Sequence, residues 1–238
     1  MFGKKRMRTL SVDIGGSHVK ASVLSARGTM IHERVRAETP NDLTPNRLVK
    51  IIVDLTEQLP RYDRVSVGFP GVVRGGVILT AANLGDEKFA RFNLERALTR
   101  ALEAPVRVCN DADMQGFAAI RGDGVEMVIT LGTGFGSSLF EDGRLGPHIE
   151  LAHHPFHHDH TYEDELGDAA LKRVGRSVWN RRLSLAIHTL RALTRFDHLY
   201  IGGGNSRNVR LKLPSDISVV DNKAGIIGGI RLWAGEKA

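Results

Sequence analysis

Cysteine, aromatic residues and long apolar runs are all scarce in this chain of 238 residues. Its single cysteine, Cys109, excludes an internal disulfide and a zinc site built on several cysteines. No apolar run approaches the roughly 18 residues that a membrane-spanning helix needs. The basic start MFGKKRMR leads directly into a predicted strand and lacks the apolar region of a signal peptide. We therefore expect a cytoplasmic protein without a membrane partner.

Acidic residues are the scarcer charge, because 33 lysines and arginines stand against 27 aspartates and glutamates and give a net charge of +6. Residues 172–212 hold ten basic side chains and one acidic one, Asp197. This excess favours an anionic partner, although a solvated helix face, a dimer interface or an acidic protein partner would also explain it. Nucleic acid is not expected, since aromatic residues make up only 6% and no known binding motif is present.

The hydrophobic pattern predicts an α/β protein. Short β-branched runs bounded by glycine or aspartate predict strands at residues 9–13, 20–25, 29–36, 64–68, 106–109, 126–131, 136–140, 198–202 and 217–220. Helical periodicity covers residues 45–59, 94–102, 112–121, 163–195 and 224–233. We expect an N-terminal lobe over residues 1–109, a C-terminal lobe over residues 110–222, and a closing helix at residues 223–238 that packs back on the first lobe.

Two glycine-rich turns stand between predicted strands, DIGGSHVK at residues 13–20 and LGTGFGSS at residues 131–138. Glycine lets the backbone approach phosphate oxygens and point its N–H groups at them. The repeat predicts two related halves that hold one polyphosphate chain, with Asp13 holding a hydrated magnesium ion and Lys20 meeting phosphate. Plain structural turns would also explain each motif, and the Walker pattern is absent.

The motif VCNDAD places Asn110 and Asp111 after a predicted strand and before a predicted helix. An aspartate there could take the proton from an attacking hydroxyl group, as phosphoryl transfer to an alcohol requires. Helix capping by Asn110 or Asp111 explains the same pattern without catalysis, and both roles can hold together.

Histidines gather in the segment that follows, since six of the ten lie between His148 and His160. Their spacing matches no metal-binding pattern, so we expect sugar contact for Glu150 and His153 and a solvated loop for the others. A later strand ends in YIGGGN, where Gly203, Gly204 and Asn205 fit close approach to a nucleotide or, equally, a helix-entry loop.

Seven motifs in this order resemble the ROK family of sugar kinases and, within it, the polyphosphate glucokinase branch. They cover most of the chain and are DIGGS, VGFPGVVRGGVILTAANL, NDAD, LGTGFGSSLF, ELAH, YIGGGNS and NKAGIIGG. The resemblance implies a two-lobed actin-like ATPase fold, related to hexokinase and ribonuclease H, with a central cleft. It implies transfer of a phosphoryl group from polyphosphate or ATP, with Mg²⁺, to the 6-hydroxyl of glucose.

Roles for single residues follow from the resemblance. Asp111 would be the general base, and Asp13 would organise magnesium through water. Sugar would be held by Gly71, Asn83, Asn110, Asp111, Glu150 and His153. Donor phosphates and nucleotide would be held by Asp13, Gly15, Gly16, Ser17, Lys20, Gly132, Thr133, Gly134, Gly203, Gly204 and Asn205.

Three departures from the family pattern qualify these expectations. The cysteine-rich zinc motif that many members carry is absent, so no structural zinc is expected. Asp113 stands where many members have asparagine, which matches the polyphosphate branch, and Ala152 replaces a usual glycine beside the sugar site. Another hexose, such as mannose, fructose or an N-acetylated sugar, and a non-catalytic sugar-binding protein stay open as alternatives. We expect a homodimer.

Overall fold

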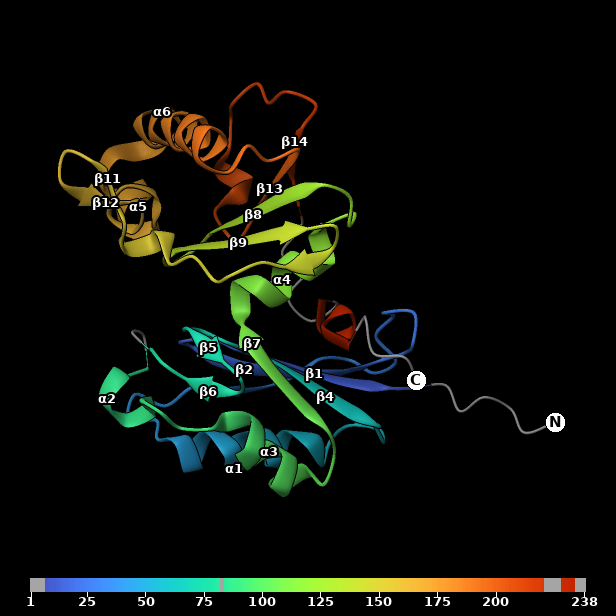
Figure 1. The fold of residues 1–238 in the computed structure, drawn as a ribbon. Coiled ribbons are helices and arrows are strands. Elements are labelled where there is room, and N and C mark those ends of the chain that lie inside the picture. The colour runs from blue at the N-terminus through green and yellow to red at the C-terminus, as the bar shows by residue number, and fades with distance from the viewer. Residues whose placement is uncertain (1–6, 82–83, 221–227, 234–238) are drawn as a thin grey trace. The chain divides into compact units, whose positions relative to one another are not determined.

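The computed structural model describes residues 7–81, 84–220 and 228–233. These residues form two compact units (Figure 1). Unit 1 comprises the described residues up to Ala118 together with Gly228–Trp233, and unit 2 comprises the described residues from Ala119 onward to Val220. The division falls within helix α4 (Asp111–Ala119). The domain boundary expected just before that helix stays a prediction.

Unit 1 is built on a mixed sheet of five strands in the order β3-β2-β1-β4-β7. The strands are β1 (Thr9–Ile14), β2 (His18–Leu24), β3 (Val35–Glu38), β4 (Arg64–Phe69) and β7 (Val106–Asn110). The first three pair antiparallel, while β1, β4 and β7 run parallel. The carboxyl ends of these parallel strands therefore meet at one edge of the sheet.

Strict alternation of side chains decides which face of this sheet is apolar. Leu10, Val12 and Ile14 are fully buried in one apolar core with residues of helices α1 (Pro45–Thr56) and α3 (Leu94–Leu102). The predicted start of α1 is confirmed, since the Thr44 side chain accepts a hydrogen bond from the Arg47 N–H and proline follows at once.

The opposite, serine-bearing face of the sheet is covered by a 3₁₀ helix, η3 (Gly228–Trp233). Ser66 Oγ donates to the Gly229 carbonyl at 2.5 Å, and Trp233 Nε1 donates to Ser66 Oγ at 2.8 Å. The guanidinium of Arg107 lies 4.3 Å from the Trp233 ring centre. Of the predicted closing helix, residues 224–227 lie outside the described residues; the described part is 3₁₀ and packs on unit 1.

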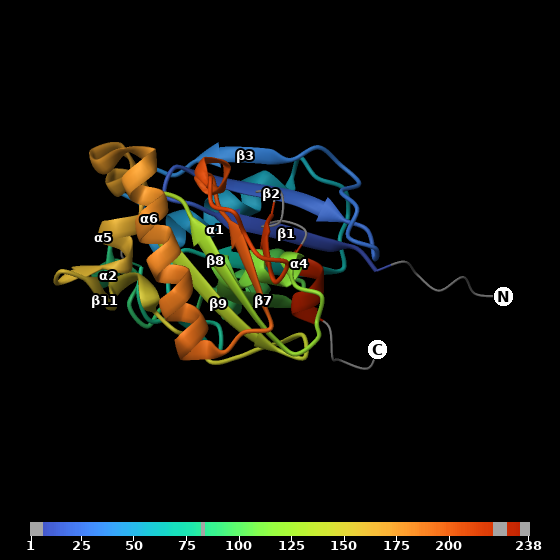
Figure 2. The same ribbon diagram turned by 90° about the horizontal axis from the view of Figure 1, so that it is seen from above.

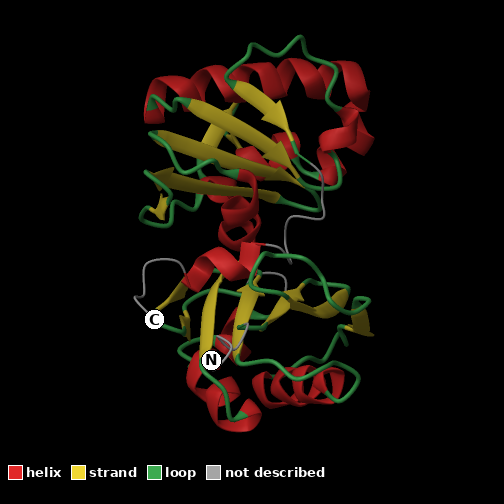
Figure 3. Ribbon diagram, turned by 90° about the vertical axis from the view of Figure 1, so that its right-hand side faces the viewer, coloured by secondary structure: helices red, strands yellow, loops and turns green. Residues whose placement is uncertain are grey.

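Unit 2 repeats the sheet pattern of unit 1. Figure 3 draws the strands of both sheets in yellow. Its order is β10-β9-β8-β13-β14, with an antiparallel hairpin series on one side and parallel strands on the other. The strands are β8 (Val125–Leu131), β9 (Phe135–Glu141), β10 (Arg144–Leu145), β13 (His198–Gly202) and β14 (Ile217–Val219). The predicted relationship between two halves is thus confirmed in strand order.

Two helices cover one face of the second sheet, α5 (Tyr162–Leu166) and the long α6 (Asp168–Thr194) (Figure 2). The single helical region predicted over residues 163–195 is wrong at two points. The chain breaks at Gly167, and Gly175 lies in the left-handed region with φ 75°. Glycine permits that second break at no steric cost.

The predicted strand at residues 29–36 is largely wrong. Residues 29–34 form no strand: Met30 makes one isolated bridge to Leu24, Met30 and Ile31 remain exposed, and β3 begins only at Val35, where it pairs with β2. Asp142 and Gly143 form the tight turn between β9 and β10, where both have the positive φ that Asp-Gly readily supplies. The remaining elements are β5 (Val73–Arg74), β6 (Val77–Ile78), α2 (Asp86–Phe89), η1 (Leu151–His153), β11 (Pro155–His157), β12 (His160–Thr161) and η2 (Ser206–Asn208).

Within the described ranges, no helix combines the length and apolar character that crossing a bilayer requires.

The contacts of Trp233 predict a measurable stability loss on substitution. Trp233→Ala removes the hydrogen bond to Ser66 and the cation–π contacts with Arg64 and Arg107, and should lower the free energy of unfolding by about 2 to 3 kcal/mol in urea titration. Trp233→Phe keeps a ring but no N–H and should lose about 1 kcal/mol. An unchanged midpoint for Trp233→Ala would contradict this account.

Candidate functional site

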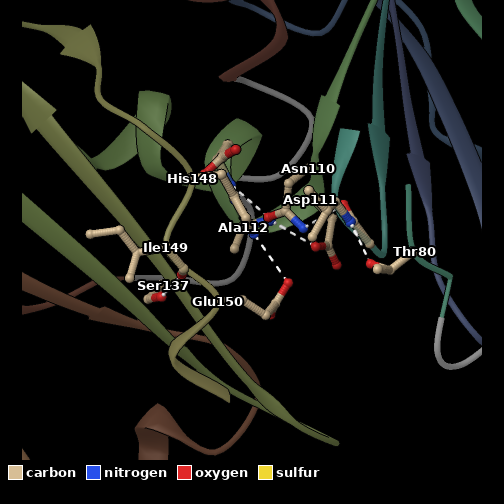
Figure 4. Close-up of polar contacts among 11 residues, drawn as sticks. Thr80, Asn110, Asp111, Ala112, Ser137, His148, Ile149 and Glu150 are labelled. Atoms are coloured by element: carbon tan, nitrogen blue, oxygen red, sulfur yellow. Dashed lines mark hydrogen bonds and ion pairs between the residues drawn. The ribbon is translucent and has the colours of Figure 1, made fainter. Parts of the chain in front are cut away.

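The end of β7 is fixed by the side chain of Asn110 (Figure 4). Its Oδ1 accepts hydrogen bonds from the N–H groups of Ala112 at 2.8 Å and Asp113 at 3.2 Å, so it caps α4. Its Nδ2 donates to the Gly71 carbonyl at 3.1 Å. The capping interpretation is therefore confirmed, and one amide N–H is left over for a ligand. Sugar binding by Asn110 stays a prediction that depends on that N–H.

Asp111 begins α4 with its carboxylate against its own helix terminus, where Oδ1 accepts from the Ala112 N–H at 2.8 Å. Burial raises the pKa of Asp111 to about 7, and the negative charges of Asp13 and Asp113 add to the effect. Two hydrogen bonds from backbone N–H groups act in the opposite direction. A carboxylate with this pKa exchanges protons readily near neutral pH, as a general base must.

Asp13 lies toward the same edge of the sheet, at the carboxyl end of β1. It pairs across the β1–β2 hairpin with Lys20, whose Nζ is 3.5 Å from its Oδ2. The turn between the two strands is closed by the Gly15 N–H, which donates to the His18 carbonyl at 3.0 Å. A β-carbon on Gly16 would meet no atom within 4 Å. The fold itself therefore does not demand glycine at that position, and the space beside it is open.

Gly71, in contrast, is demanded by the fold of unit 1. A β-carbon there would lie 2.0 Å from the carbonyl oxygen of Thr80, a backbone atom. Thr80 also accepts a hydrogen bond from the Val72 N–H at 3.0 Å. Asn83, the other predicted sugar ligand of this segment, lies outside the described residues.

The second glycine turn lies between β8 and β9 in unit 2, and several elements hold it. The Gly132 carbonyl accepts from the Asp168 N–H at 2.9 Å and from Asn205 Nδ2 at 3.2 Å, while the Asn205 N–H donates to the Leu131 carbonyl at 2.8 Å. The structure therefore brings the segment after β13 beside this turn, so that the predicted donor-binding residues of unit 2 lie close together. They are Gly132, Thr133, Gly134, Gly203, Gly204 and Asn205.

Two acidic residues at this turn were missed from the sequence. Glu163 Oε2 accepts from the Phe135 N–H at 3.3 Å, and a β-carbon on Gly134 would lie 2.2 Å from that oxygen. The Asp168 carboxylate contacts Lys172 at 2.5 Å, and this bond lowers the pKa of Asp168. Gly167, with acidic residues on both sides, is a signal for a break between two helices. The helical periodicity of residues 163–195 led instead to the prediction of one continuous helix.

Glu150 makes a different contact from the one expected. Its carboxylate pairs with His148 Nε2 at 3.2 Å (Figure 4). This hydrogen bond is the main reason why the pKa of Glu150 lies below its usual range, and the nearby His153 contributes less. Sequence reasoning singled out His153 and missed His148, two residues before the glutamate. The His153 side chain is exposed, at the end of η1.

The other histidines of this segment lie on or beside a small hairpin, β11–β12, and the expected loop is wrong in that respect. His158 and Asp159 form its tip with positive φ. In the part of the chain that the structure describes, no three metal-ligating side chains are placed to hold one ion.

Comparison with known proteins gives matches that cover between 58% and 94% of this chain. Residues 9–160 match the ROK family. The polyphosphate glucokinase of Mycobacterium leprae is 27% identical over 241 residues, which cover 94% of this chain and 74% of that protein. An N-acetylmannosamine kinase of Escherichia coli O139:H28 is 34% identical over 146 residues, covering 58% of this chain and 49% of the relative.

A solved structure extends this similarity to the fold. The inorganic polyphosphate/ATP-glucomannokinase of Arthrobacter sp. strain KM matches with a TM-score of 0.82 and 30% identity, over 94% of this chain and 97% of that one. The predicted α/β class and the actin-like ATPase fold are confirmed.

The glycines of unit 2 predict unequal responses to alanine. Gly203 has φ 85°, and a β-carbon there would lie 2.3 Å from the Leu131 carbonyl oxygen, so Gly203→Ala should cost about 3 kcal/mol of unfolding free energy or more. Gly132 faces open space, so Gly132→Ala should change stability by less than about 1 kcal/mol. Denaturant titration of both variants tests this, and equal losses would refute it.

Proposed function

Because this chain belongs to the ROK family, we propose that it is a sugar kinase that transfers a phosphoryl group from ATP or inorganic polyphosphate to the 6-hydroxyl of glucose. The observation that carries the proposal is the position of Asp111, at the carboxyl end of β7 and the start of α4, with one oxygen held by a backbone N–H. A rigidly held carboxylate at a sheet edge suits the general base of such a reaction.

In the proposed reaction, the oxygen of the sugar hydroxyl attacks the terminal phosphorus of the donor, and Asp111 accepts the proton of that hydroxyl. The bond between that phosphorus and the bridging oxygen breaks, and the shortened donor leaves with the electron pair. Proton acceptance supplies about 10²- to 10⁴-fold, while positioning and charge neutralisation supply most of the rest. The cap made by Asn110 fixes the first turn of α4 and therefore the position of Asp111, the residue that begins this helix.

Donor phosphates are assigned to the two glycine turns. Gly16 and Gly132 each face open space although neither needs to be glycine for the fold, which fits close approach of phosphate oxygens to the backbone. In unit 1 the residues assigned to donor phosphates are Gly15, Gly16, Ser17 and Lys20. In unit 2 they are Gly132, Thr133 and Gly134, with Gly203, Gly204 and Asn205 beside the nucleotide when ATP is the donor.

Magnesium fits the acidic edge of unit 1. Asp13 raises the pKa of Asp111 by its charge, so a cation near Asp13 would relieve repulsion between two carboxylates. A single carboxylate with water and substrate phosphates is a usual arrangement for Mg²⁺. When bound, the ion would neutralise charge on the donor phosphates. We assign Asp13 to this ion through water.

Sugar hydroxyls are assigned to Gly71, Asn83, Asn110, Glu150 and His153. His148 joins this group as a positioning residue, because its bond keeps the Glu150 carboxylate ionised and oriented as an acceptor. We further propose a cytoplasmic homodimer with no structural zinc, which sedimentation and metal analysis would test.

A second hexose is a specific alternative. The N-acetylmannosamine kinase matches over residues that amount to 58% of this chain, and the Arthrobacter structure is that of a glucomannokinase. Turnover of mannose or N-acetylmannosamine well above that of glucose would favour this alternative. A non-catalytic sugar-binding role has no comparable support, since Asp13, Asn110, Asp111, Glu150 and His153 are all present.

Asp111→Asn should lower kcat for glucose phosphorylation by about 100- to 10,000-fold, because the amide accepts no proton at neutral pH. The isosteric change keeps an oxygen for the Ala112 N–H, so the fold should persist. Asp54→Asn, an exposed acid in α1, serves as the matched control and should keep full activity. Wild-type turnover by folded Asp111→Asn would defeat the assignment.

The pH profile offers an independent check of Asp111. The base works only when ionised, so kcat/KM should fall about tenfold per pH unit as pH drops below about 7. Asp113→Asn removes one of the charges that raise the pKa of Asp111, so this acidic limb should move to lower pH. A limb that stays in place, or moves upward, would contradict the proposed electrostatics; Asp54→Asn should leave it unmoved.

A further inference from the structure

Basic side chains line residues 205–214, the segment that follows β13 and its glycines. Between Asn205 and Pro214, apolar and basic residues alternate. Val209, Leu211 and Leu213 pack against the core of unit 2, while Arg210 and Lys212 are exposed between them. Arg207, at the start of the segment, is also exposed. The alternation thus turns one edge of this segment into a row of cations.

Helix α6 adds a further cation to this row. Asn180 holds the segment against the helix, because its Oδ1 accepts from the Arg210 N–H at 2.7 Å and its Nδ2 donates to the Asn208 carbonyl at 3.0 Å. The same Nδ2 contacts the carbonyl of Arg176, one helical turn earlier, at 2.8 Å. The backbone of Arg176, whose side chain is exposed, therefore lies next to the segment. We call Arg176, Arg207, Arg210 and Lys212 the basic strip.

The basic strip is continuous with the donor turn. Asn205, two residues before Arg207, bonds to the backbone of Leu131 and Gly132. The charge of Arg207 also acts on Asp168, whose N–H donates to the Gly132 carbonyl. A linear anion that leaves the turn beside Asn205 would meet Arg207 first.

Several other basic residues of this region already have acidic partners. Arg182 contacts the buried Glu165 at 2.6 Å, Arg191 contacts Asp216 at 2.5 Å, and Lys172 contacts Asp168. Among the residues that the structure describes, no carboxylate lies within ion-pair distance of Arg176, Arg207 or Lys212. These three cations are therefore available to an external anion.

We propose that the basic strip binds the distal phosphates of an inorganic polyphosphate donor, those beyond the groups held by the glycine turn of unit 2. This inference rests on the proposed kinase function. Each phosphate of such a chain carries negative charge, and guanidinium groups bind phosphate oxygens with paired N–H donors. Binding releases counterions, so every additional contact strengthens affinity at low salt. ATP has only three phosphates, so the basic strip adds nothing to the affinity for ATP.

The test compares donors in one pair of matched variants. Arg176→Gln/Arg207→Gln removes two cations of the strip and leaves Arg210, whose guanidinium bonds to the carbonyls of Arg207 and Val209. Arg96→Gln/Arg100→Gln removes two exposed cations from α3 of unit 1 and serves as the control. Initial rates are measured with polyphosphate of about 100 units, with tripolyphosphate and with ATP, each over a range of salt concentrations.

For the strip variant, we expect KM for long polyphosphate to rise about tenfold or more, while KM for tripolyphosphate and ATP changes less than twofold. The slope of log KM against log salt concentration should decrease by about two for long polyphosphate and stay unchanged for the two short donors. The control should match the wild type. Three results would overturn the proposed role of the basic strip: an unchanged KM for long polyphosphate, an equal rise in KM for all donors, or a wild type that uses ATP but not polyphosphate. Absence of sugar phosphorylation with every donor would instead refute the kinase function. Single Arg207→Gln, which should give part of the effect, covers misfolding of the double variant.

Discussion

The side-chain amide of Asn110 is the contact on which the candidate active site depends. Its oxygen caps α4 through two N–H groups, and its nitrogen holds the Gly71 carbonyl. One side chain thereby joins the end of β7, the start of α4 and the loop that follows β4. Asp111 takes its place from this junction, since it is the first residue of the capped helix. Loss of the amide would remove both the cap of the helix that Asp111 begins and the bond to the Gly71 carbonyl.

The sheet topology explains why the carboxylates of unit 1 act on one another. Because β1, β4 and β7 run parallel, Asp13 and Asp111 come to the same edge although about a hundred residues separate them in the chain. Burial and the Asp13 charge then raise the pKa of Asp111 to about 7. Unit 2 has the same strand order, so its β8–β9 turn corresponds to the β1–β2 turn of unit 1. Both sheets thus present a glycine turn at this position, and the carboxylates of Asp13 and Asp111 belong to unit 1.

Local sequence signals were sufficient for most of the fold. The predicted bounds of α3 and β13 match the structure, because both have clear periodicity and strong end signals. The sequence placed Asn110 and Asp111 between a strand and a helix expected from residue 112; the structure has Asn110 as the cap and Asp111 as the first helical residue. The strand predicted over residues 29–36 failed over residues 29–34, where the chain makes one isolated bridge, from Met30 to Leu24, before β3 begins at Val35. The pairing of Glu150 with His148, and the bonds of Glu163 and Asp168 to the second turn, depend on tertiary contacts that no local pattern encodes.

The most direct test of the account is identification of the reaction product. Purified protein is incubated with glucose, Mg²⁺ and either ATP or polyphosphate, with mannose and N-acetylmannosamine in parallel, and the products are analysed by phosphorus NMR. The account predicts a hexose phosphorylated at its 6-hydroxyl, formed with at least one donor and lost when Mg²⁺ is removed. No sugar phosphate from any combination, or a phosphate on another hydroxyl, would contradict it.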